Sequence, residues 1–274
     1  MIVVSCRHGF DSDVLLASDN QYRNYTNPAK PTSFKDLTLD DVLKAATNQH
    51  VAIFVHGFNN PVEDVLGAYW GMVQAMKDSG VTGPAGYGLV IGFLWPGKVT
   101  GPGYFPALVS AKRSAPFLQQ FINALRPVVL SIDVETHSLG ARVAFTALAK
   151  PKEIFIDNLL LTAPAVDNHL LEPDKSFYTA LDSCNRCFVY HSGKDPVLKV
   201  AFPIADIADG IHRALGLKGP RSRKITLDKC PNTYVVDCTS RVDSHGGYRN
   251  VAQFYDHWKQ VLSGGAMSRY DELA

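Results

Sequence analysis

Short apolar runs alternate along the chain with longer stretches in which apolar residues recur every three or four positions. The runs have the length of buried strands, and the longer stretches have the spacing of amphipathic helices. The pattern predicts strands at 2–5, 51–55, 88–94, 128–136, 159–162, 187–190 and 234–237, with a weaker one at 13–17. It predicts helices at 37–46, 61–77, 108–125, 139–149 and 251–262. Strands that alternate with helices in this way favour an α/β fold, with a mostly parallel central sheet and helices on both faces.

Prolines and glycines interrupt this alternation at a few places. Residues 20–31 and 95–104 are rich in turn-forming residues, so we expect loops there. Pro116 lies inside a predicted helix and should kink or split it. The segment 196–224 is too long for a simple connection, and Pro203 could begin a helix within it. This segment is predicted to be either a small lid insertion or an ordinary helix packed on the sheet.

Composition narrows the class of protein. The chain has 274 residues and no linker that would divide it, so we expect a single domain over 1–274. With 19% charged residues and a net charge of +1, the sequence argues against disorder and against a nucleic-acid partner. No apolar run reaches the length of a membrane span, and the first residues lack the basic region of a secretory signal. We therefore expect a soluble, cytoplasmic protein; the oligomeric state is not predicted.

The five cysteines form an odd number, which argues against a full disulfide framework. Cys184 and Cys187 have the spacing of a redox or zinc motif, but Cys230 and Cys238 are too far apart to complete a usual zinc site. Structural, reduced thiols are the simpler interpretation, and no metal or cofactor is expected.

The stretch from Thr136 to Gly140 contains the main candidate for catalysis. A strand that stops at Thr136 and a helix that starts at Leu139 would leave Ser138 on a sharp turn at the end of the sheet. Such a turn presents a nucleophilic serine, and it needs small residues two positions either side. Gly140 meets this requirement and Thr136 meets it only in part. The alternative is an ordinary strand-to-helix turn with Ser138 as the helix cap.

A nucleophilic serine needs a base and an acid that orients the base, and in a parallel sheet both should follow strands. His245 follows the last strand, whereas the side chain of His137 is expected to be turned away from Ser138. Asp195 follows the strand at 187–190 and is favoured as the acid over Asp167. Asp243 is too close to His245 in sequence to orient it.

The oxyanion of an acyl-transfer intermediate needs backbone N–H donors. Leu139, at the start of a predicted helix, can supply one. Phe58, in the loop after the strand at 51–55, can supply the other because Gly57 permits the turn.

This combination resembles the α/β-hydrolase superfamily, in which the nucleophile, acid and base follow in the order of Ser138, Asp195 and His245. It is most similar to a bacterial family of α/β hydrolases whose substrates are mostly uncharacterised. The motifs that carry this resemblance are Val55-His-Gly-Phe-Asn-Asn60, Leu94-Trp-Pro-Gly97, His137-Ser-Leu-Gly-Ala-Arg142 and His245-Gly-Gly-Tyr248.

The resemblance implies a serine hydrolase without a cofactor, and we expect a small-molecule carboxylic ester as the substrate. In this hypothesis Ser138 forms an acyl-enzyme, His245 moves the proton, and Asp195 holds the imidazole ring. Two alternatives remain open at this point. One is an amide or thioester hydrolase with the same residues, and the other is a hydrolase-like protein that binds a ligand without turnover.

Overall fold

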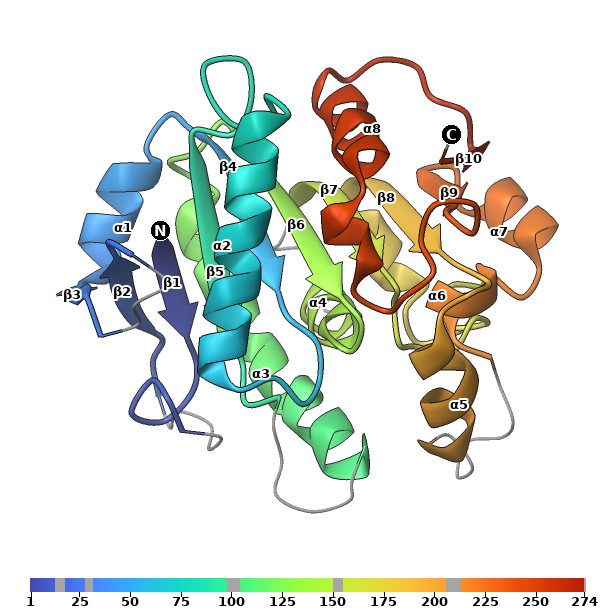
Figure 1. Ribbon diagram of the computed structural model, residues 1–274, viewed down its shortest axis with the longest axis horizontal. Helices are drawn as coiled ribbons and strands as arrows, with labels where there is room; N and C mark the ends of the chain where they lie inside the picture. Colours follow the sequence, from blue (N-terminus) through green and yellow to red (C-terminus); the bar gives the residue numbers. More distant parts are fainter. Residues whose placement is uncertain (13–17, 28–31, 98–103, 150–154, 206–212, 274) are drawn as a thin grey trace.

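A mostly parallel sheet of ten strands runs through the part of the chain that the structure describes. That part of this computed structural model is the whole chain except residues 13–17, 28–31, 98–103, 150–154, 206–212 and 274. The order of strands across the sheet is β10-β9-β8-β7-β6-β4-β5-β1-β2-β3, and only β2 runs against its neighbours (Figure 1). The strands are β1 (Ile2–Ser5), β2 (Gln21–Tyr25), β3 (Phe34–Leu37), β4 (His50–Val55), β5 (Leu89–Leu94), β6 (Ser131–His137), β7 (Ile156–Thr162), β8 (Cys184–His191), β9 (Thr233–Asp237) and β10 (Tyr270–Glu272).

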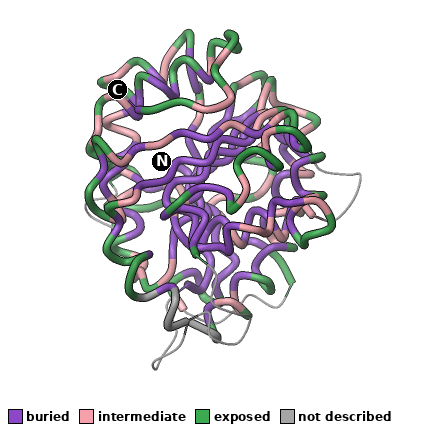
Figure 2. The backbone as a smooth tube through the Cα atoms, turned by 90° about the vertical axis from the view of Figure 1, so that its right-hand side faces the viewer, coloured by how far each residue is buried: buried purple, intermediate pink, exposed green. Residues whose placement is uncertain are grey.

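Helices cover both faces of this sheet. One hydrophobic core joins the sheet to α1, α3 and α4, and a second joins it to α2 and α8. The helices are α1 (Leu39–Ala46), α2 (Val62–Asp78), α3 (Tyr104–Leu125), α4 (Gly140–Leu148), α5 (Pro196–Ala205), α6 (Leu215–Lys218), α7 (Arg223–Lys229) and α8 (Ala252–Leu262), with short 3-10 turns η1 (Thr179–Ser183) and η2 (Gly247–Asn250). Buried residues concentrate in the sheet between the two layers, so the predicted α/β architecture is confirmed (Figure 2).

Local sequence explains where several elements begin. Thr38 caps α1 through a reciprocal pair of hydrogen bonds with Asp41, so this helix begins at Leu39, after β3, and not at Leu37. The apolar run of β4 is buried from Val51 to Val55, as a strand with helices on both faces requires.

Three details of the prediction are wrong. The expected loop at 20–31 contains β2, which pairs through its backbone with β1 and β3 although its side chains are mostly half-buried polar groups. Pro116 does not split α3, although a kink there stays a prediction; it is exposed, as is Lys112, so water can solvate the carbonyl that loses its helical partner. Pro203 does not begin a helix, because α5 already begins at Pro196.

Part of the segment predicted as a lid is packed into the body of the molecule. The N–H groups of Leu215 and Gly216 donate to the carbonyl groups of Val166, at 2.7 Å, and Pro164, at 2.9 Å. Residues 206–212, where the predicted helix would continue, lie outside the described residues, as does the strand predicted at 13–17. The movement of a lid therefore stays a prediction.

The two edge strands of the sheet are short and carry charge. On β3, the guanidinium of Arg23 from the neighbouring strand lies 3.9 Å from the centre of the Phe34 ring and also pairs with Asp36 at 2.9 Å. On β10, Asp271 and Glu272 are both exposed. Among the described helices, none is long and apolar enough to cross a membrane.

Candidate active site

Ser138 occupies a strained turn between β6 and α4. Its φ angle is 56°, in the left-handed region that residues other than glycine rarely adopt. The turn is held by two backbone hydrogen bonds of 3.0 Å, from Ser138 N–H to the Thr162 carbonyl and from Ala165 N–H to the Ser138 carbonyl. Strain of this kind persists where the surrounding structure enforces it, and it is common at functional sites.

Two glycines make room for this turn. A Cβ atom on Gly140 would lie 2.4 Å from the Val55 carbonyl oxygen, and one on Gly57 would lie 2.9 Å from the Cβ of Ser138. Neither position can therefore hold a larger residue without a shift of the backbone. Thr136 lies in regular parallel pairing within β6, so the turn forms although this position is not glycine.

The structure brings Ser138, His245 and Asp195 together. His245 Nε2 lies 2.8 Å from Ser138 Oγ, and His245 Nδ1 lies 2.7 Å from Asp195 Oδ2. Asp195 is fully buried, whereas the His245 side chain is 18% exposed. An ionised carboxylate only accepts hydrogen bonds, so Nδ1 carries the proton and Nε2 is left to accept from the serine hydroxyl.

The loop that carries Asp195 is fixed from two sides. The second carboxylate oxygen of Asp195 accepts the N–H of Leu198 at 3.0 Å, which caps the start of α5. Ser192, three residues earlier, donates its hydroxyl to the carbonyl of Val242, in the loop that leads to His245. This bond fixes the loop that carries Asp195 against the loop that carries His245.

The side chain of His137 lies beside His245, which corrects the expectation that it turns away. His137 Nε2 donates to the backbone carbonyl of His245 at 2.8 Å, and the two ring centres are 4.7 Å apart. Burial and the neighbouring His245 lower the pKa of His137 to about 3, so its ring is neutral and Nε2 keeps the proton that this bond requires.

The loop after β4 is supported by the tryptophan that follows β5. The rings of His56 and Trp95 stack with their centres 5.4 Å apart, and Trp95 Nε1 donates to the His56 carbonyl at 2.7 Å. The Trp95 N–H donates to His56 Nε2, so His56 Nδ1 is the donor to the Gly57 carbonyl at 2.8 Å. Gly57 of this loop lies against Ser138, and Phe58 is the next residue of the loop. Leu139, the residue after Ser138, directly precedes α4.

The other candidates lie outside this cluster. Asp167 is buried in an isolated bridge with Ala214, and Asp243 is exposed. All five cysteines are buried free thiols, and burial raises the pKa of Cys184 to about 12. Within the described ranges, no group of three His, Cys, Asp or Glu residues is arranged to hold a metal ion.

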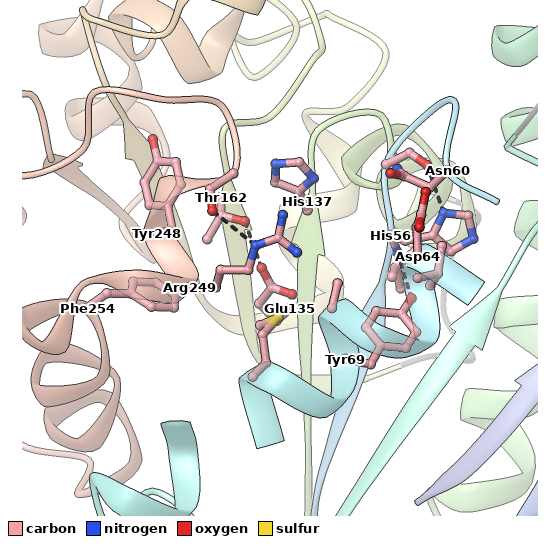
Figure 3. A pocket seen from close by; sticks show the side chains of 16 residues that line it. His56, Asn60, Asp64, Tyr69, Glu135, His137, Thr162, Tyr248, Arg249 and Phe254 are labelled. Carbon is pink, nitrogen blue, oxygen red and sulfur yellow. Dashed lines mark hydrogen bonds between the residues drawn. The ribbon is translucent and has the colours of Figure 1, made fainter. Parts of the chain in front are cut away.

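A cavity of about 320 Å³ beside this cluster contains residues that sequence reasoning missed (Figure 3). Glu135 is 3% exposed and accepts the Thr162 hydroxyl at 2.7 Å, and burial raises its pKa to about 7. Arg249, from η2, extends over it. The sequence did contain a sign of this polar wall: Asp133, Glu135 and His137 occupy every second position of β6, so their side chains share one face of the sheet.

Comparison with known proteins agrees with this architecture. Residues 31–234 match the model of a family described as alpha/beta hydrolase of unknown function (DUF900), a region that includes Ser138 and Asp195 and ends before His245. A search among curated proteins gave no match.

Similar solved structures have low sequence identity, and two of the three described next are esterases. An esterase of Pyrococcus furiosus is 13% identical, with 89% of this chain and 85% of that chain covered and a TM-score of 0.46. Carboxyl esterase 2 of the fungus Tuber melanosporum is 10% identical, with 90% and 88% covered and a TM-score of 0.44. The Francisella virulence factor BioJ is 14% identical, with 81% and 79% covered and a TM-score of 0.42.

Proposed function

The chain belongs to this family of α/β hydrolases of unknown function, and on that premise we propose that it is a serine hydrolase that cleaves carboxylic esters. One observation carries the proposal: Ser138 Oγ, His245 and Asp195 form an unbroken chain of hydrogen bonds of 2.8 and 2.7 Å. A serine hydroxyl is a weak nucleophile at neutral pH, and a base at this distance, itself oriented by a carboxylate, is what activates it.

In the proposed reaction, Ser138 Oγ attacks the acyl carbon of the ester while His245 Nε2 takes the hydroxyl proton. Asp195 stabilises the imidazolium that forms. His245 then returns the proton to the leaving alcohol, and an acyl-enzyme remains on Ser138. A water molecule, deprotonated by the same histidine, releases the carboxylic acid and restores the serine.

The negative charge on the former carbonyl oxygen would be stabilised by the N–H groups of Phe58 and Leu139. The first N–H groups of a helix have no partner within that helix, so Leu139, directly before α4, has a donor to offer. Phe58 belongs to the loop that crosses next to Ser138. By analogy with measured donors, loss of one such group slows acyl transfer by on the order of 10² to 10³.

The test is covalent labelling of the purified protein with a fluorophosphonate, together with turnover of p-nitrophenyl esters. We expect one label per chain on Ser138, and loss of turnover by on the order of 10⁶ in a Ser138→Ala variant that keeps its fold. Ser114 is a matched control, since it is a buried serine of α3 far along the chain from His245. A Ser114→Ala variant should keep both labelling and turnover.

A protein that binds a ligand without turnover would give a different result. The wild-type chain would then resist the fluorophosphonate, or the Ser138→Ala variant would hydrolyse esters at the wild-type rate. Either result rules out the proposed function.

A further inference from the structure

A second pocket, of about 470 Å³, lies towards the edge of the sheet that ends in β10. It is lined by His191 and Asp237, the last residues of β8 and β9, and by the segment that leads from α6 to α7 (Figure 1). Gly193 and Thr239, from the loops after these two strands, also line it. Ser138 does not, so this pocket is separate from the proposed catalytic site.

The segment between α6 and α7 is held in one conformation by its backbone. The N–H of Arg221 donates to the carbonyl of Asn168 at 2.8 Å. Gly219 turns the chain with a φ angle of 69°, and a Cβ atom there would lie 3.2 Å from Nε2 of His191. Glycine therefore lets the chain pass this close to β8 without a shift. Because the backbone beside Lys218 is fixed in this way, a ligand meets a preorganised wall.

Cationic side chains outnumber carboxylates around this pocket. Lys218, Arg221 and Arg223 line it, together with the carboxylate of Asp237. Arg221 pairs with Glu172 at 2.5 Å. Lys218 and Arg223 form no ion pair with a carboxylate of the described residues. Two cations without a close partner thus face one carboxylate, and an anion in the pocket would balance the excess.

These two cations approach the pocket from different sides. The guanidinium of Arg223 lies 3.8 Å from the centre of the Tyr270 ring, on the side of β10. The ammonium of Lys218 lies 3.8 Å from the place that a Cβ atom on Gly193 would take, in the loop that leads to Asp195. Both long side chains are exposed, so each can reach a ligand in the space between them.

The charges of both side chains act on the same buried ring. Burial lowers the pKa of His191, and Asp237 opposes this effect. The charges of Arg223 and Lys218 lower the pKa further, so the ring is neutral at pH 7 and lies within the field of both cations. The carboxylate of Asp237 is already bonded to the N–H of Thr239 at 2.9 Å. The pocket thus favours an anion.

Phosphate is the anion that matches these groups. A guanidinium presents its N–H donors in a planar fork that fits two phosphate oxygens, and a lysine adds a compact charge. A phosphomonoester carries about −1.5 to −2 charges at pH 7, whereas a carboxylate carries one. The volume lies within the range of small-molecule sites, and Leu217, Pro220 and the Tyr270 ring add apolar surface. An organic body attached to the phosphate therefore has a surface to contact.

We propose that this pocket binds a small organic phosphate, a phosphomonoester, whose phosphate group lies between Lys218 and Arg223. The organic part lies against Leu217 and Pro220. This site goes beyond the proposed ester hydrolysis and does not depend on it. A ligand that binds only the folded chain also stabilises it, so binding is measurable without turnover.

The experiment is isothermal titration calorimetry of the whole chain in a phosphate-free buffer of low ionic strength. The ligands are glycerol 3-phosphate, adenosine 5′-monophosphate, inorganic phosphate, and glycerate as a carboxylate of small size. We expect at least one of the two phosphomonoesters to bind roughly tenfold or more tightly than both glycerate and inorganic phosphate. The proposal is overturned if neither ester binds at millimolar concentration, or if glycerate or inorganic phosphate binds as tightly as the better ester.

Two variants connect the affinity to the pocket. Lys218→Gln and Arg223→Gln each remove one charged donor, and each should weaken the binding of the better ester by roughly tenfold. Both side chains are exposed, so both variants should fold. Arg113→Gln is the matched control, because Arg113 is an exposed arginine of α3 that does not line the pocket. An affinity that is unchanged in both pocket variants, or that falls as much in Arg113→Gln, contradicts the proposal.

Labelling separates this site from the catalytic one. Modification of Ser138 with a fluorophosphonate should leave the affinity for the ester unchanged, because Ser138 does not line the pocket. Loss of binding after labelling would assign the ester to the catalytic site and overturn the proposal. A chain that resists labelling, yet binds the ester through Lys218 and Arg223, overturns the proposed hydrolysis and supports this site.

Discussion

His245 is held at two points. Asp195 fixes the ring through Nδ1, and His137 fixes the backbone through the carbonyl oxygen. Since His137 directly precedes Ser138, the second bond ties the base to the same dipeptide that carries the nucleophile. Displacement of a reacting group by about 1 Å can slow an enzyme by on the order of 10², so this short connection gives His137 a positioning role.

Two substitutions of His137 test that role. The amide nitrogen of glutamine falls near the place of Nε2, whereas that of asparagine falls near Nδ1. We therefore expect His137→Gln to keep most of the turnover of p-nitrophenyl esters, and His137→Asn to lose roughly ten- to a hundredfold in kcat. Thermal unfolding of both variants is the control for stability. Equal losses in two equally stable variants would contradict a role for the bond to His245.

A second prediction concerns the residue that acts as the acid and orients His245. An asparagine at 195 would donate to Nδ1 and reverse the tautomer of His245, so we expect Asp195→Asn to lower kcat by about 10⁴, as in other hydrolases with this arrangement. Asp167→Asn, at the competing buried aspartate, should lower it less than about tenfold. Ester turnover of the two purified variants decides between them, and a larger loss at Asp167 would reassign the acid.

The sequence could predict those site residues whose place in the fold follows from the order of strands along the chain. Ser138, Asp195 and His245 each follow a strand, and parallel strands end at one edge of a sheet. The side chain of His137 could not be placed in this way, because its direction depends on the left-handed turn at Ser138. Arg249 was missed because it lines a cavity whose walls come from separate parts of the chain and meet only in the folded protein.

Strand β6 organises the site at the scale of elements. Its apolar residues Ile132 and Val134 face the core shared with α1, α3 and α4, and the titratable residues between them face α2 and α8. One strand therefore supplies packing on one side and polar chemistry on the other. The prediction read this stretch as an apolar run, because Asp133 and Glu135 are single charges among β-branched residues.

Two elements approach each other closely where α4 begins against the end of β4. Gly140→Ala would place a methyl group 2.4 Å from the Val55 carbonyl oxygen, so the backbone must shift. We expect a loss of about 1–3 kcal/mol in the free energy of unfolding, together with lower turnover because Ser138 moves with the helix. Urea denaturation measures the first and ester hydrolysis the second.

Gly71 provides the control for this substitution. It lies in α2, and a Cβ atom there would have no neighbour within 4 Å. Gly71→Ala should therefore stabilise the protein by roughly 0.5–1 kcal/mol, as alanine does in a helix. A Gly140→Ala variant as stable and active as Gly71→Ala would show that the approach of β4 and α4 can relax.

Elements with a continuous apolar face could be predicted, and short strands held largely by backbone pairing could not. The long helices and the central strands were found with small shifts at their ends. Strands β2, β3 and β10 were missed, because they are short and mostly polar and their stability comes from the neighbouring strand.

For the whole molecule, buried carboxyl groups make stability depend on pH. Burial raises the pKa of Glu135 from 4.5 to about 7, although Thr162 and Arg249 favour its ionised form. Asp133, also buried, has its pKa raised to about 6. In this range the unfolded chain has released protons that the folded chain still holds. The contribution of these two carboxyl groups to the free energy of unfolding should therefore fall as the pH rises from about 4.5 to about 7 and level off above that. The buried His137, whose pKa is lowered from 6.5 to about 3, contributes in the opposite direction up to about pH 6.5.

Glu135→Gln removes the larger part of this dependence. Its gain in stability over the wild type should be small near pH 4 and should grow to at most roughly 3 kcal/mol at pH 8. Urea denaturation of both proteins across this range measures the difference. A difference that stays constant with pH would show that the pKa of Glu135 is the same in the folded and the unfolded chain.

The charged edges of the sheet have a consequence for encounters between molecules. An edge strand exposes unpaired backbone groups, and a second chain can add to them and begin an aggregate. Here one edge ends in two adjacent acidic residues, Asp271 and Glu272, which would repel the same edge of another copy. At the other edge, Arg23 covers the ring of Phe34 and neutralises Asp36. A sheet of ten strands is thereby protected at both ends against fibril-like growth.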